Sequence, residues 1–85
     1  MSQGQITIYS ADHCGDCRRS KQLMDELNVA YTIIDVEADQ AAADKVKEIN
    51  GGKQSIPVIV FADGTHLTEP SDNDLKAKLT SLGII

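Results

Sequence analysis

The chain has 85 residues, of which 41% are hydrophobic and 25% are charged, and 13 acidic against 8 basic residues give it a net charge of −5. This length predicts one domain over residues 1–85, and the acidic balance argues against a nucleic-acid partner, which needs a concentrated basic face. No apolar run approaches the roughly 20 residues of a transmembrane helix, and the start, MSQGQ, does not resemble a signal peptide. We therefore expect a soluble cytoplasmic protein with no membrane partner.

Hydrophobic periodicity and turn residues divide the chain into strands and helices. In chain order the predicted elements are a strand at Gln5–Ser10, a helix from about Cys17 to Leu27, a strand at Ala30–Val36, a helix at Asp39–Asn50, a hairpin at Ile56–Thr68 and a helix within Pro70–Leu82.

Turn and cap residues mark the ends of these elements. The first helix begins near Gly15, and Gly51 and Gly52 stop the second. Asp63 and Gly64 are suited to the positive φ angles of a tight hairpin turn. The strand-helix-strand unit implies a parallel pair with a right-handed crossover, while the hairpin adds an antiparallel pair. The sequence thus predicts an α/β fold with a mixed sheet flanked by three helices.

The third helix and the hairpin carry two further signals. Ser71 is the expected N-cap, with Asp74 three residues later, and Leu75, Leu79 and Leu82 then form one apolar stripe. Pro57 fits only at the first residue of a strand or on a sheet edge, because it lacks a backbone N–H.

The two cysteines, Cys14 and Cys17, allow three interpretations. A structural disulfide across two residues removes little unfolded-state entropy, and a cytosolic setting tends to reduce it. A zinc site with His13 and His66 lacks the usual ligand spacing. A redox pair is favoured, because Cys-x-x-Cys beside a strand-helix unit is typical of that chemistry. Free N–H groups and the positive end of the helix dipole stabilise a thiolate on the first cysteine.

The segments ITIYS, CGDCRRSK and NGGKQSIPVIVFADGTHLTEPS resemble the glutaredoxin family, and within it they are most similar to mycoredoxins. The resemblance covers nearly the whole chain. It implies a thioredoxin fold with four strands in the order 2-1-3-4, and thiol-disulfide exchange with a low-molecular-weight thiol. It also implies that Cys14 is the nucleophile, Cys17 the resolving thiol and Pro57 a cis-proline that faces the pair.

The same resemblance implies a binding site for the small thiol. The backbone of Ile56 would bind the cysteinyl part, and Lys53 stands near a position that often contacts a ligand carboxylate. Ser71 and Asp72 occupy the place that holds the other end of the ligand, and His13 flanks the nucleophile. From the residues alone, however, Ser71 and Asp72 are also an ordinary helix cap and first-turn acid, and His13 and His66 are also ordinary exposed residues.

Three departures from glutathione-using members bear on the thiol. Ala11 stands where many have a lysine, Asp16 where many have an aromatic residue, and Thr68–Asp72 replaces a glycine pair. These differences favour mycothiol as co-substrate over glutathione. Arg18 and Arg19 are expected to favour the Cys14 thiolate and Asp16 to disfavour it, unless these charges merely face solvent.

The predicted function is thiol-disulfide exchange by a monomeric enzyme that needs no metal or prosthetic group. Cys14 would attack the small-thiol sulfur of a protein mixed disulfide, while Cys17 would complete the reduction of protein disulfides. Partners would be S-thiolated or oxidised proteins and a disulfide reductase. Two alternatives are an electron donor to ribonucleotide reductase, fed by thioredoxin reductase, and a module that binds an iron-sulfur cluster between two chains.

Overall fold

The computed structural model describes residues 6–85, so Gln5 of the first predicted strand lies outside the described residues. The elements are β1 (Thr7–Ser10), α1 (Gly15–Glu26), β2 (Thr32–Asp35), α2 (Gln40–Ile49), β3 (Val58–Val60), β4 (His66–Thr68) and α3 (Asp72–Ser81). Their order and types are those predicted, and the strands are shorter than the apolar runs that indicated them.

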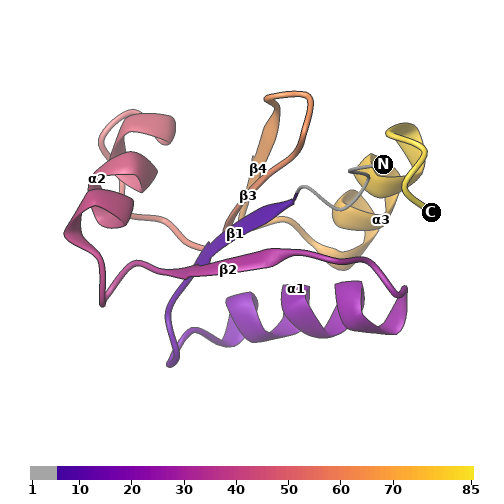
Figure 1. Cartoon of the computed structure of the whole chain (residues 1–85), viewed down its shortest axis with the longest axis horizontal. Helices are drawn as coiled ribbons and strands as arrows, with labels where there is room; N and C mark the ends of the chain where they lie inside the picture. The colour runs from indigo at the N-terminus through magenta and orange to yellow at the C-terminus, as the bar shows by residue number, and fades with distance from the viewer. Residues whose placement is uncertain (1–5) are drawn as a thin grey trace.

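The four strands form one mixed sheet in the order β2-β1-β3-β4 (Figure 1). The central strand β1 runs parallel to β2, with Ile8 opposite Ile33, and antiparallel to β3, with Ile8 opposite Ile59. The hairpin pairs β3 with β4. This is the strand order implied by the resemblance to glutaredoxins, and it places the carboxyl end of β1 beside the amino end of β3.

The main core lies between the sheet, α1 and α3. Alternate residues of β1 are buried, because successive side chains of a strand point to opposite faces. The helix α2 lies on the other side of the strands from α3 in Figure 1, and its buried residues are Ala42 and Val46. The main core cluster consists of Ile6, Ile8, Leu23, Met24, Val29, Ile59, Phe61, Leu75 and Leu79.

The predicted ends of α2 are confirmed by hydrogen bonds to its terminal backbone groups. Asp39 caps α2, its carboxylate accepting from the backbone N–H groups of Ala41 and Ala42. Gly51 and Gly52 follow the helix with φ of 69° and 107°, and the N–H of Gly52 donates to Lys47 O at 2.6 Å. Glycine takes such angles without the steric penalty of a side chain. No helix within residues 6–85 is both long and apolar enough to cross a membrane.

The β3–β4 hairpin turns at the predicted residues, but Asp63 stabilises the turn in a way that differs from the prediction. Gly64 has φ of 88°, but Asp63 does not take the positive φ that the dipeptide suggested. Its carboxylate instead accepts from Thr65 N at 3.0 Å and Thr65 Oγ1 at 2.6 Å, which closes the turn through a side chain. Beyond β4, Glu69 has φ of 48° and is followed by Pro70, so the strand ends after three residues.

Candidate active site at the start of α1

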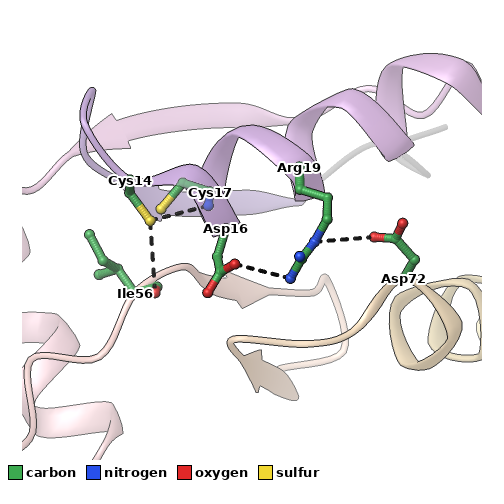
Figure 2. Close-up of polar contacts among 6 residues, drawn as sticks. All are labelled: Cys14, Asp16, Cys17, Arg19, Ile56 and Asp72. Atoms are coloured by element: carbon green, nitrogen blue, oxygen red, sulfur yellow. Dashed lines mark hydrogen bonds and ion pairs between the residues drawn. The ribbon is translucent and has the colours of Figure 1, made fainter.

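Cys14 forms the N-cap of α1. The chain turns after β1, where Cys14 N donates to Ala11 O at 3.2 Å, and helical residues begin at Gly15. The Cys14 sulfur then accepts a hydrogen bond from Cys17 N at 3.1 Å (Figure 2). A sulfur in this position receives one of the unpaired N–H groups at the positive end of the helix, which favours its thiolate form.

Cys17 lies one turn inside α1 and its environment is the opposite of that of Cys14. It is fully buried, whereas Cys14 is partly exposed, and both are free thiols. Burial, together with the hydrogen bond with Cys14, raises the pKa of Cys17 to about 12. Cys17 is therefore protonated at neutral pH, and the two sulfurs are suited to different steps.

The loop before β3 faces the Cys14 sulfur. The Ile56–Pro57 peptide bond is cis, as the resemblance implied, and Pro57 directly precedes β3. The carbonyl oxygen of Ile56 lies 4.0 Å from the Cys14 sulfur, which donates to it as a thiol (Figure 2). This contact places the Ile56 backbone beside the atom to which a small thiol would be attached.

Asn50, the C-cap of α2, holds this loop in place, and no sequence pattern points to it. Its amide nitrogen donates to Ser55 O at 2.9 Å and to Lys53 O at 3.4 Å. Its amide oxygen accepts from Thr68 Oγ1 at 2.7 Å. A single side chain therefore joins the end of α2, the loop that leads to Pro57, and β4.

The charged residues near Cys14 pair mainly with one another. Arg19 reaches Asp16 at 3.1 Å and Asp72 at 3.8 Å, linking α1 to the first turn of α3 (Figure 2). Arg18 donates to Asp12 O at 3.2 Å across the turn. These side chains are exposed, so each pair contributes little to stability. The charge of Arg19 is shared between two carboxylates, which weakens its action on the thiolate.

A groove lies between the turn that precedes Cys14 and α2. We call it the α2 groove; its volume is about 490 Å³, and His13 Nδ1 at its edge lies 3.3 Å from Glu37 Oε1. Of the residues implied by resemblance, it includes His13 and Ile56. It is lined by Ala11, His13, Val36, Glu37, Gln40, Ala43, Val46, Gln54 and Ile56.

The remaining predicted residues lie elsewhere around the site. Lys53 is exposed and lies outside the set that lines the α2 groove. Ser71 is the N-cap of α3, where its hydroxyl accepts from Asp74 N at 3.1 Å. With Arg19, Asp72 and a neighbouring asparagine it lines a second, shallower hollow of about 280 Å³. Within residues 6–85, no three His, Cys, Asp or Glu side chains are grouped to hold a metal ion.

Comparison with known proteins identifies the family. The family model for glutaredoxin matches residues 6–67. The chain belongs to the glutaredoxin family. A glutaredoxin-named protein of Mycobacterium tuberculosis is 40% identical over 82 residues, which cover 96% of this chain and 98% of that protein. Mycoredoxin 1 of Corynebacterium glutamicum is 36% identical over 77 residues, covering 91% of this chain and 95% of the relative.

Solved structures agree with this placement. A variant of a thioredoxin-like protein superimposes with a TM-score of 0.78 and 28% identity, covering 94% of this chain and 97% of the other. The fold is thus that of thioredoxins and glutaredoxins. As a glutaredoxin, the protein is a thiol-disulfide oxidoreductase with a Cys-x-x-Cys pair, Cys14 and Cys17.

Proposed function

We propose that this glutaredoxin reduces mixed disulfides between proteins and a low-molecular-weight thiol, with mycothiol favoured over glutathione. The observation that carries the proposal is the contrast between the two sulfurs. Cys14 is partly exposed and accepts from the helix N-terminus, while Cys17 is buried and protonated. Only Cys14 is suited to attack a disulfide from solvent, because the thiolate is the nucleophilic form.

The monothiol reaction needs Cys14 alone. Its thiolate attacks the small-thiol sulfur of the mixed disulfide, and the protein sulfur leaves with the electron pair of the broken bond. A second small thiol, as thiolate, then attacks the small-thiol sulfur attached to Cys14. This step releases the oxidised small-thiol dimer and regenerates the Cys14 thiolate, so electrons balance without a prosthetic group.

The reduction of a protein disulfide also needs Cys17. Cys14 first forms a mixed disulfide with the target protein, and Cys17 then attacks the Cys14 sulfur. The leaving thiolate of the target takes up the proton that Cys17 must lose. The product is the Cys14–Cys17 disulfide, which a small thiol or a disulfide reductase then reduces. A role as donor to ribonucleotide reductase would use this route.

The small thiol would bind across the site with its sulfur at Cys14. The position of the Ile56 carbonyl and of Pro57 supports backbone contacts to the cysteinyl part. His13 lies on one side of Cys14, in the α2 groove, while Ser71 and Asp72 line the hollow on the α3 side. Lys53 is the exposed cation of the preceding loop. We propose that the site works in a cytoplasmic, monomeric protein of one domain.

The two cysteine variants test this function. With a protein carrying a mycothiol mixed disulfide, Cys17→Ser should retain turnover and Cys14→Ser should lose it. Release of the reduced protein is followed by mass spectrometry, and circular dichroism checks that each variant is folded. An inactive but folded Cys17→Ser would contradict the monothiol route. A visible absorption band after anaerobic reconstitution with iron and sulfide would favour the cluster-binding alternative instead.

A further inference from the structure

The loop that joins α2 to β3 brings the Ile56 carbonyl to the Cys14 sulfur, although residues 53–56 belong to no helix or strand. Within residues 6–85, the hydrogen bonds to residues 53–56 come from two side chains, those of Cys14 and Asn50. The bond from Cys14 is the contact of 4.0 Å to the Ile56 carbonyl in Figure 2. The other support of the loop is therefore Asn50.

Asn50 is itself fixed through both its backbone and its side chain. Its backbone N–H donates to Val46 O at 3.0 Å at the end of α2. Its amide oxygen accepts from Thr68 Oγ1 at 2.7 Å. The oxygen and nitrogen of an amide point in different directions, so this bond leaves the nitrogen to donate to Ser55 O and Lys53 O. Asn50 is partly buried, which strengthens these bonds relative to exposed ones.

The end of β4 fixes the loop on both sides of Ile56. On one side Thr68 acts through the Asn50 amide, and on the other the backbone N–H of Glu69 donates to Pro57 O at 2.8 Å. Without the Asn50 bonds, the loop would be tied to β4 only at its β3 end. An aspartate at position 50 could accept from Thr68 but could not donate to the loop, and an alanine could do neither.

We infer that Asn50 is a positioning residue for thiol-disulfide exchange, and that it acts by holding the Ile56 backbone at the Cys14 sulfur. The loop forms one side of the space in front of this sulfur (Figure 2), so its position determines where a substrate disulfide can lie. Small displacements of reacting atoms slow a reaction strongly. The inference concerns the exchange step itself and does not depend on which small thiol the protein uses.

Two reactions of the reduced protein separate substrate placement from the reactivity of the sulfur. A peptide with an internal disulfide is reduced to its dithiol as the Cys14–Cys17 disulfide forms, and it must lie against the loop. Iodoacetamide alkylates the partly exposed Cys14 without such placement. Both second-order rate constants are measured at one pH by acid quenching and mass spectrometry. Asn50→Ala should react about tenfold more slowly with the peptide, and no more slowly with iodoacetamide.

Further variants identify which bond matters and control for stability. Asn50→Asp keeps the acceptor for Thr68 but loses both donations to the loop, so it should be as slow as Asn50→Ala. Thr68→Val should slow the peptide reaction only about threefold, because the amide keeps its loop contacts, and Thr68→Ser should match the wild-type protein. Asp63→Ala removes two hydrogen bonds at the other end of the β3–β4 hairpin and should leave the peptide rate unchanged.

NMR order parameters of residues 53–56 report the position of the loop directly. They should fall in Asn50→Ala and stay at the wild-type values in Asp63→Ala. A folded Asn50→Ala with the wild-type peptide rate would overturn the positioning role, and so would equal slowing with peptide and iodoacetamide or equal slowing in Asp63→Ala. Should Asn50→Ala fail to fold, the comparison of Thr68→Val with Thr68→Ser decides, and equal peptide rates in that pair would overturn the role.

Discussion

The N-termini of α1 and α3 are capped by the same type of hydrogen bond, but the cap has a different role in each helix. At α1 the Cys14 sulfur accepts from Cys17 N at 3.1 Å, and at α3 the Ser71 oxygen accepts from Asp74 N, also at 3.1 Å. Each cap thus satisfies the N–H of the third helical residue. Both capping residues have an extended backbone, and the capping atom is a thiol sulfur in one helix and a hydroxyl oxygen in the other.

The third helical residue completes the contrast. At α3 it is the exposed Asp74, which adds negative charge where the helix dipole favours it. At α1 it is the buried Cys17, which stays neutral. The positive end of the helix dipole therefore contributes to stability at α3, whereas at α1 it acts on the sulfur of Cys14. Variants that make one helix N-terminus resemble the other should separate the effect on stability from the effect on the sulfur.

The largest expected effect comes from making the cap of α1 resemble that of α3. Cys14→Ser keeps a capping oxygen and removes the thiolate, so activity toward mixed disulfides should fall by at least about 10³-fold with no loss of unfolding free energy. Turnover and urea unfolding of the same preparation check this. A variant that loses activity and several kcal/mol of stability together would show that the sulfur is required for folding as well.

The second prediction uses the pKa of Cys17, which is raised to about 12. Below pH about 9 the thiol is protonated in folded and unfolded chains. Above it the unfolded chain loses the proton first, so stability falls as pH rises from about 9 to about 12. Between pH 7 and 10.5 the loss should be about 2 kcal/mol, and it should be absent in Cys17→Ala.

Urea unfolding under reducing conditions at the two pH values measures this difference. Tyr31, whose pKa burial and Asp25 also raise to about 12, contributes equally to both proteins and cancels in the comparison. Parallel loss of stability in the wild-type protein and in Cys17→Ala would mean that the buried thiol is not the group that titrates.

Removing the cap of α3 should have a smaller effect. Ser71→Ala leaves the N–H of Asp74 without its side-chain acceptor and should cost about 1 kcal/mol of unfolding free energy. Ser71→Asn, which restores a capping oxygen, should recover most of this loss. Thermal unfolding of the three proteins provides the measurement, and equal stability of the alanine and asparagine variants would argue against the cap.

The smallest effect is expected from the first-turn acid of α1. Asp16→Asn removes a negative charge near the Cys14 thiolate, which stabilises the reduced pair and makes its reduction potential less negative. Since Asp16 is exposed and paired with Arg19, the change should be only about 10 mV. Equilibration of the Cys14–Cys17 pair with a reference dithiol measures it, and a shift to a more negative potential would contradict the sign.

The elements of this fold could be predicted because their signals are local. Helical periodicity, the cap Ser71 and the glycines after α2 each depend on a few neighbouring residues, and the structure places the helix ends where these residues are. The strand order rested on the resemblance to glutaredoxins. The conformation of Asp63 was predicted wrongly, since a carboxylate can close a turn by hydrogen bonding without a positive φ.

The surroundings of Cys14 could not be predicted from local patterns. Arg19 meets Asp72 only because α1 and α3 pack together, and Asn50 reaches β4 through a hydrogen bond that spans 18 residues. The α2 groove takes its lining from segments on both sides of α2. In the sequence, Glu37 does not differ from the other acidic residues. It lies beside His13 because β1 and β2 pair in parallel, so that the segments after both strands meet at one end of the sheet.

The brevity of the outer strands also protects the molecule against fibre growth. An exposed sheet edge offers unpaired N–H and C=O groups to another chain. Here β4 stops after three residues at Glu69 and Pro70, and β2 has four residues, with the exposed Ile33 among them. Neither edge strand is long enough to present an extended template. The protein can therefore expose Ile33 on an edge strand and still resist strand pairing between molecules.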